Sequence, residues 1–173
     1  MPDPALEPTG DYLPDPAPKA SELIAKICSY AVITLLDYHP RKEAMNNALV
    51  VKLASEKGYR VLADPVDQPN LQGVFDASKL ALQELADGGE AVEAYVVAVD
   101  SFMGFEDMPE LPAADPNGEP YAEDQRFILM FAGEAVQPKG TMVVQAYKNR
   151  RWRPGAAPLG APFIGDGPDS LLS

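Results

Sequence analysis

The stretch Tyr147–Gly155 (YKNRRWRPG) carries the densest positive charge in the sequence, on Lys148, Arg150, Arg151 and Arg153. These bases stand out because the whole chain has a formal net charge of −12. Arginine side chains bind phosphates, and an indole such as that of Trp152 can stack on a nucleic-acid base. Arginine and tryptophan are also frequent anchors of protein–protein interfaces. The stretch is therefore compatible with a nucleic-acid site, a protein-docking site or a structural role at the end of a strand.

The charge of the remaining chain argues against the first of these interpretations. A surplus of acids repels phosphate backbones and anionic lipids, so we expect neither a nucleic-acid nor a membrane partner. In the structural interpretation, Trp152 covers one end of the core while the arginines pair with the chain's own carboxylates. In the docking interpretation, the arginines and the segment Pro154–Gly165 bind a protein partner or a second copy of the chain. The predicted docking residues are Arg150, Arg151, Trp152, Arg153, Phe163 and Ile164.

The sequence between Lys79 and Arg126 contains twelve acids and no base. Carboxylates can act as general acids or bases, or as metal ligands, once burial shifts their pKa values. Asp100, Glu106 and Asp107 are the examples nearest to the predicted sheet. The alternative function is therefore an enzyme or metal-binding protein that uses carboxylates of the long acidic loop 101–125.

The stretch DPNGEP (Asp115–Pro120) comes closest to a metal-binding pattern, with side-chain oxygens on Asp115, Asn117 and Glu119. An EF-hand calcium loop places its glycine at the sixth position, whereas the glycine here is the fourth residue of the stretch. A tight turn at Asn117 and Gly118 accounts for the same residues. We therefore predict a turn here, with no bound metal and no cofactor.

The chain has one histidine, His39, and one cysteine, Cys28. They lie eleven residues apart on the same predicted helix, which separates them by about 16 Å and prevents a cysteine–histidine pair within one chain. Cys28 falls on an apolar helical face, so we expect a small core residue rather than a reactive thiol. The sequence also lacks phosphate-binding, dinucleotide-binding and nucleophile-elbow motifs. We expect no catalytic residue.

The first half of the sequence shows helical periodicity. Ser21 is a predicted N-cap, and the apolar spacing that follows predicts a helix ending near His39, before Pro40. The same spacing predicts a second helix from Pro40 to Gly58, with an apolar stripe formed by Ala44, Met45, Ala48, Leu49, Val51 and Leu53. A short strand is predicted over Tyr59–Asp64, and a third helix over about Phe75–Asp87.

The period changes after Gly89. Three segments rich in β-branched and aromatic residues predict strands, and the last two form a hairpin: Ala91–Asp100, Arg126–Gly133 and Thr141–Lys148. The predicted fold class is α+β, with two to three N-terminal helices packed on a small antiparallel sheet of three to four strands. The proline-rich ends predict extended termini, with residues 1–18 as an acidic arm, 19–153 as a single domain and 154–173 as a tail that includes a turn at Gly165–Pro168.

The single cysteine, the lack of a signal-peptide pattern and the lack of a membrane-spanning apolar run predict a soluble cytoplasmic protein. Together these features favour a small non-enzymatic binding or interaction protein that docks through the Arg150–Arg153 stretch and the tail. A protein partner or a homodimer is the expected assembly.

Overall fold

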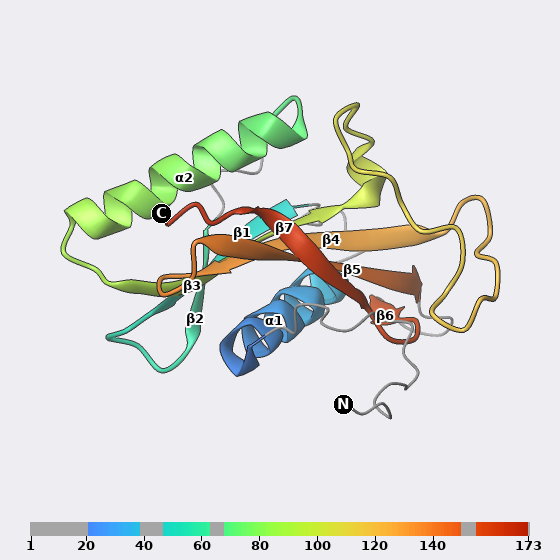
Figure 1. Ribbon diagram of the computed structural model, residues 1–173, viewed down its shortest axis with the longest axis horizontal. Helices are drawn as coiled ribbons and strands as arrows, with labels where there is room; N and C mark the ends of the chain where they lie inside the picture. Colours follow the sequence, from blue (N-terminus) through green and yellow to red (C-terminus); the bar gives the residue numbers. More distant parts are fainter. Residues whose placement is uncertain (1–20, 39–46, 63–67, 150–154, 173) are drawn as a thin grey trace, which may run out of the picture.

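The computed structural model describes residues 21–38, 47–62, 68–149 and 155–172. Two α-helices, one short 3-10 helix and seven strands occur in these ranges (Figure 1). In chain order they are α1 (Glu22–Tyr38), β1 (Asn47–Leu53), β2 (Tyr59–Leu62), α2 (Leu71–Asp87), β3 (Val92–Asp100), η3 (Ser101–Met103), β4 (Arg126–Glu134), β5 (Lys139–Asn149), β6 (Ala156–Pro158) and β7 (Phe163–Asp169).

All seven strands belong to one antiparallel sheet that curls into a half-barrel. The order across the sheet is β2-β1-β3-β4-β5-β6, and β7 also pairs with β5. The long strand β5 has two neighbours on one edge, since its residues 139–144 pair with β7 and its residues 147–149 pair with β6. The predicted antiparallel sheet is thus confirmed, although it is larger than expected.

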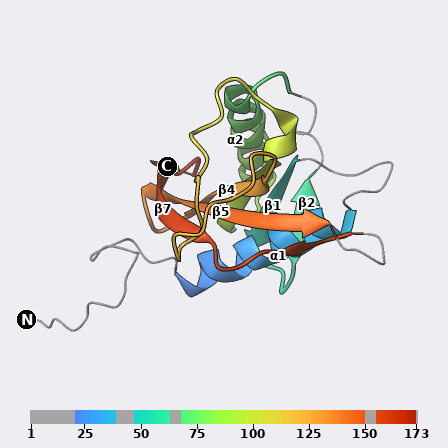
Figure 2. The same ribbon diagram turned by 90° about the vertical axis from the view of Figure 1, so that its right-hand side faces the viewer.

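The two helices cover opposite faces of this sheet, with α1 on one side and α2 on the other (Figures 1 and 2). Strand β3 shows the consequence, because its residues 94–100 are all buried. Its alternate side chains enter two separate cores: Val96 packs on the α1 side and Val97 on the α2 side. A strand covered on both faces needs apolar residues at successive positions, which explains the run AYVVAV.

The first helix begins as its sequence predicts. The Ser21 hydroxyl oxygen accepts a hydrogen bond from the backbone N–H of Ile24 at 3.1 Å, which satisfies a donor that the first helical turn leaves without an intrahelical partner. Helix α1 then extends to Tyr38, the last residue described before a gap, so His39 lies outside the described residues. Neither helix in the described part of the chain has the length and apolar character needed to cross a membrane.

The second helix in the structure, α2, begins four residues before its predicted start. Asn70 caps it by accepting a hydrogen bond from the N–H of Gly73 at 2.7 Å. The predicted end at Asp87 is confirmed, and the N–H of the next residue, Gly88, bonds to carbonyls of the last turn. The predicted strands Ala91–Asp100, Arg126–Gly133 and Thr141–Lys148 are confirmed as β3, β4 and β5. The predicted Tyr59–Asp64 strand is confirmed over Tyr59–Leu62 as β2, and residues 63–64 lie outside the described ranges.

The predicted fold class is wrong in its proportions, because the structure has two helices on a seven-stranded sheet. The predicted helix from Pro40 to Gly58 is replaced over Asn47–Leu53 by strand β1, while residues 40–46 lie outside the described ranges. In β1 the residues from Ala48 to Val51 are all buried between the two helical layers. A continuous apolar run fits a doubly covered strand as well as a helix, and Val50 and Val51 favour the strand.

The prediction of an extended proline-rich C-terminus is also wrong over the described residues, because β6 and β7 pair with β5. Gly140 and Gly167 permit the close approach of β5 and β7. A Cβ added at Gly140 would lie 2.4 Å from the Pro168 carbonyl oxygen, and one at Gly167 would lie 2.8 Å from the Thr141 carbonyl carbon. Gly167 of the predicted Gly165–Pro168 turn therefore lies in a strand that contacts its neighbour closely.

Candidate binding site

The residues predicted to dock a partner fall into two groups. Arg150, Arg151, Trp152 and Arg153 lie outside the described residues, so their role stays a prediction. Phe163 and Ile164 open strand β7, where they pair with Val144 and Val143 of β5. Both are half-buried: Ile164 packs against the core on the α1 side, and Phe163 packs against the core on the α2 side.

Two of the carboxylates predicted as candidate acid–base groups or metal ligands, Asp107 and Asp100, instead accept hydrogen bonds that hold the fold together. Asp107 accepts hydrogen bonds from the N–H groups of Leu71 at 2.8 Å and Gln72 at 2.9 Å, at the start of α2. The bond from Leu71 is the main cause that lowers the pKa of Asp107. Because amides at a helix start lack intrahelical acceptors, Asp107 anchors the acidic loop to this helix.

Asp100 is buried at the end of β3 and has two hydrogen-bond donors. Its Oδ2 accepts from the Tyr147 hydroxyl at 2.5 Å, and its Oδ1 accepts from the N–H of Phe102 at 2.9 Å. Burial and, next, the bond to Asp100 raise the pKa of Tyr147. The guanidinium of Arg126 lies 4.3 Å from the centre of the Phe102 ring. These contacts fasten the ends of β3, β4 and β5 together, just before the Arg150–Arg153 stretch.

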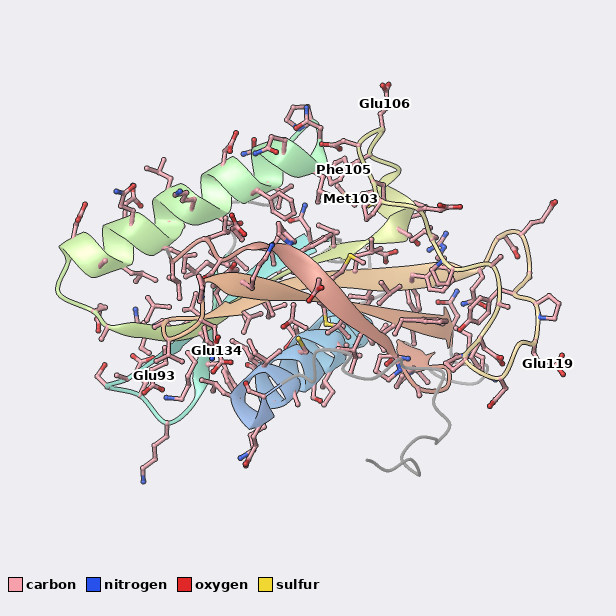
Figure 3. The ribbon with its side chains drawn as sticks, viewed as in Figure 1. Glu93, Met103, Phe105, Glu106, Glu119 and Glu134 are labelled. Atoms are coloured by element: carbon pink, nitrogen blue, oxygen red, sulfur yellow. The ribbon has the colours of Figure 1, made fainter. Side chains whose placement is uncertain are left out.

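The remaining loop carboxylates do not converge. Glu106 and Glu119 are exposed and project from different parts of the loop (Figure 3). The predicted turn is confirmed, because one Asp115 carboxylate oxygen accepts from the N–H groups of Asn117 and Glu119, both at 2.9 Å. Within the described ranges, His, Cys, Asp and Glu side chains form no group of three that could hold a metal ion.

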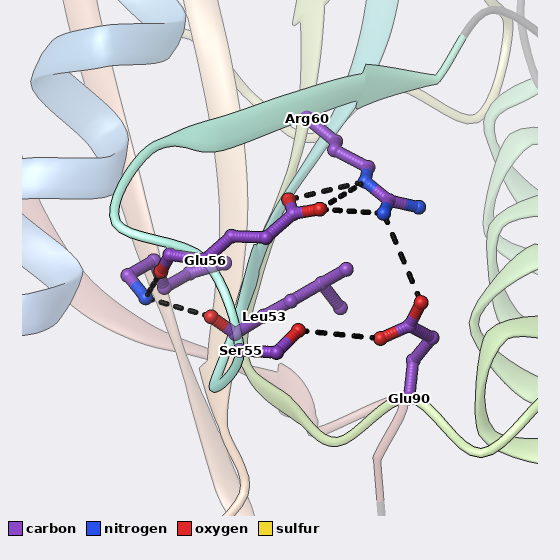
Figure 4. Close-up of polar contacts among 6 residues, drawn as sticks. Leu53, Ser55, Glu56, Arg60 and Glu90 are labelled. Atoms are coloured by element: carbon purple, nitrogen blue, oxygen red, sulfur yellow. Dashed lines mark hydrogen bonds and ion pairs between the residues drawn. The ribbon is translucent and has the colours of Figure 1, made fainter.

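A second polar cluster, at the turn between β1 and β2, is also structural (Figure 4). The Arg60 guanidinium bonds Glu56 at 2.5 Å and lies 3.8 Å from Glu90 in the connection between α2 and β3. Lys52 donates from its ammonium group to the backbone carbonyls of Leu53 and Glu56. The bond from Arg60 lowers the pKa of Glu56. This cluster closes the hairpin and ties it to the neighbouring loop.

An apolar groove of about 320 Å³ lies along one flank of α1, facing β5, β6 and β7. Ala25, Cys28 and Val32 of α1 form one wall. Met130 and Val143 of the sheet form the floor, with the side chains of Pro158, Pro162 and Ile164 opposite the helix. The groove exists because α1 contacts β1, β3, β4 and β6 and leaves part of β5 and β7 on this face uncovered.

The polar side chain nearest the floor is held by the backbone. The Gln145 amide nitrogen donates to the carbonyls of Ala146 at 2.9 Å and Gly160 at 3.1 Å, which fixes the segment leading to β7 beside the groove. We call this site the α1 groove. Its volume falls within the range of about 300–1,000 Å³ typical of binding pockets.

The outer lip of the α1 groove is formed by Ile33, whose side chain is 60% exposed. Cys28, lower on the same wall, is 5% exposed, and burial raises the pKa of its thiol to about 12. The expectation that Cys28 is a small apolar core residue agrees with its place in the α1-side core. Sequence reasoning missed the groove and Ile33. The available signal was an isoleucine lying off the buried stripe of an apolar helix.

Comparison of the chain with protein-family models, curated protein sequences and solved structures found no significant match.

Proposed function

We propose that the protein is a small non-enzymatic binding protein, and that the α1 groove receives an aliphatic side chain from a protein partner. The observation that carries this proposal is the groove itself: an open apolar hollow of about 320 Å³ with an exposed isoleucine at its lip. Hollows of this kind accept the buried anchor side chains that contribute most of the binding free energy at protein interfaces.

The polar groups with candidate chemical roles in the described residues favour binding over catalysis. Asp100 and Asp107 are engaged in hydrogen bonds that hold strand ends and a helix start. The Cys28 thiol, with a pKa of about 12, remains protonated near neutral pH and is a poor nucleophile. Gln145 uses its amide nitrogen to fix the wall of the groove. An apolar side chain needs none of these groups, so it suits a hollow that is lined mainly by apolar side chains.

We propose that the predicted docking segment forms part of the groove that receives the partner, rather than inserting into the partner. Ile164, predicted as an apolar anchor that enters a partner, lines the groove of its own chain. The Arg150–Arg153 stretch immediately precedes the segment that leads into β6, and we propose that it flanks the docked partner. The tail therefore forms part of the receiving surface.

A neutral apolar dye tests whether the groove is open. We expect Nile red fluorescence to rise severalfold with the wild-type protein at low protein concentration, and Ala25→Trp to abolish most of this rise by filling the groove. Ala25 and Ala86 are both exposed alanines on helices, so Ala86→Trp on α2 is the matched control and should bind dye like the wild type. Equal dye binding by both variants, or none by the wild type, would contradict the proposal.

A further inference from the structure

We infer that the partner received by the α1 groove is a second copy of this chain. The inference rests on the proposed function, because it identifies the occupant of the same groove. Three features support it: a projecting side chain beside the hollow, a low net charge on α1, and small residues that permit close helix approach.

The first feature is the position of Ile33 at the lip of the groove. At 60% exposure it projects from the same face that contains the hollow. A two-fold axis between two copies brings the same patch of each against the other, so a projection beside a hollow can fill the hollow of the opposite copy. Two copies of Ile33 would then be buried in two equivalent sites.

The second feature is charge. Two copies that each carry −12 repel one another over most of their surface. Among the exposed side chains described on α1, the charged ones are Glu22 and Lys26, which form an ion pair at 2.9 Å. With Asp37, which follows nearer the end of the helix, α1 carries a formal net charge of only −1. Pairing of two such helices therefore costs less electrostatic repulsion than pairing of two acid-rich loops 101–125 would.

The third feature is the size of two residues that precede Ile33 on the same side of the helix. Ala25 and Ser29 are exposed and follow one another at a spacing of four, with Ile33 four residues further on. They share one side of the helix, and small side chains there allow two helices to pack at an interaxial distance of about 8 Å. Close packing of this kind would carry Ile33 down into the opposing groove.

Light scattering after size-exclusion chromatography, over a range of protein concentrations, tests the inference. The wild type should approach twice the mass of one chain as concentration rises. Ile33→Glu should raise the dissociation constant by about a hundredfold or more, because each dimer loses two buried isoleucines and places two carboxylates in apolar hollows. Leu80→Glu is the matched control, since Leu80 is 58% exposed on α2 and the added charge is the same.

The outcomes separate this inference from the proposed function. A wild-type dimer that Ile33→Glu dissociates and Leu80→Glu preserves supports both. A monomer at every concentration, with dye binding that Ala25→Trp blocks, overturns the second copy as partner and leaves the groove as a docking site for another protein. A dimer that survives Ile33→Glu also overturns the inference, because its interface lies elsewhere. A monomer that binds no dye contradicts the inference and the proposed function together.

Discussion

The hydroxyl of Tyr147 donates a hydrogen bond of 2.5 Å to the buried carboxylate of Asp100, across the intervening strand β4. Tyr147 is 2% exposed and Asp100 is 4% exposed. A buried carboxylate needs hydrogen-bond donors, so this contact stabilises the fold at the point where the basic stretch begins. It also explains why the tyrosine of YKNRRWRPG points into the protein while Lys148 and Asn149 are exposed.

Replacing this tyrosine should destabilise the protein. Tyr147→Phe removes one donor from a buried carboxylate, at an expected cost of about 1–3 kcal/mol in the free energy of unfolding. In a chain of this size each 1 kcal/mol lowers the melting temperature by roughly 2–4 °C. Urea titration of the two proteins measures the difference.

Tyr121→Phe serves as the control, because the Tyr121 ring packs edge-on against Phe127 while its hydroxyl makes no hydrogen bond within the described residues. We expect it to unfold close to the wild type. Equal stability of Tyr147→Phe and the wild type would show that Asp100 is satisfied without the hydroxyl.

The cap that Asp107 places on α2 should depend on pH. Hydrogen bonds from the helix start depress the pKa of Asp107 below its ordinary value of 3.8. The ionised carboxylate therefore stabilises the folded protein above that ordinary value, and the contribution disappears as the pH falls through the lower folded-state pKa. Asp107→Asn should unfold more readily than the wild type near neutral pH, and the difference should shrink in acid.

Hydrogen exchange gives a local measurement of the same cap. The amides of Leu71 and Gln72 should exchange faster in Asp107→Asn than in the wild type, whereas Glu106→Gln, which removes one charge from the neighbouring exposed residue, should leave them unchanged. Unaltered exchange at Leu71 and Gln72 in Asp107→Asn would show that the loop does not cap the helix.

The sequence predicted the helix ends and strands that depend on local interactions. Ser21 and Gly88 mark helix ends because their capping hydrogen bonds are local, and the strands β3 to β5 follow from β-branched runs with turn residues between them. Strand β1 was misassigned because the run from Ala48 to Val51 is apolar throughout. The β-branched Val50 and Val51 favour a strand only weakly, and its place between two helical layers decides the assignment.

The α1 groove could not be read from the sequence, because it depends on contacts between distant segments. It requires β7 to fold back beside β5, where Ile164 pairs with Val143 and faces the flank of α1. The close approach at Gly167 that permits this return has the same local signature as a turn in a flexible tail. The role of the loop carboxylates, chemical or structural, was likewise ambiguous from the sequence. Asp107 meets its hydrogen-bond donors at the start of α2 only in the folded chain.

The single thiol should report on the groove wall. The pKa of Cys28 is raised from 9.0 to about 12, so the thiolate fraction near neutral pH falls by about a thousandfold relative to an exposed cysteine. We expect alkylation by N-ethylmaleimide in the native protein to be much slower than in urea, since burial both protonates the thiol and limits access to it. A native rate close to the denatured rate would contradict the buried position of Cys28.

Self-association through the outer face of α1 should strengthen with salt. Two acidic copies repel one another over long range, and the screening length falls from about 10 Å at about 0.1 M salt to about 3 Å at about 1 M. Because the docked residue, Ile33, is apolar, little attraction is lost to screening, so the dissociation constant measured by sedimentation should fall severalfold. A dimer that weakens with added salt would instead indicate an interface dominated by ion pairs.

The most direct measurement of the central claim is a cross-link between copies, formed by oxidising the Ile33→Cys variant. Positions 28 and 33 of one helix differ by an axial rise of about 7.5 Å, which exceeds the Cα separation of about 7 Å that a disulfide bridges. If Ile33 enters the opposing groove, the new sulfur at position 33 meets Cys28 of the other copy. The Cys28 thiol reacts slowly because burial keeps it protonated, so the oxidation must be prolonged. We then predict a covalent dimer whose peptide map joins position 33 to Cys28, and its loss in the Ile33→Cys, Cys28→Ser double variant. A protein that stays monomeric on oxidation, or dimers joined only through position 33 on both copies, would contradict the account.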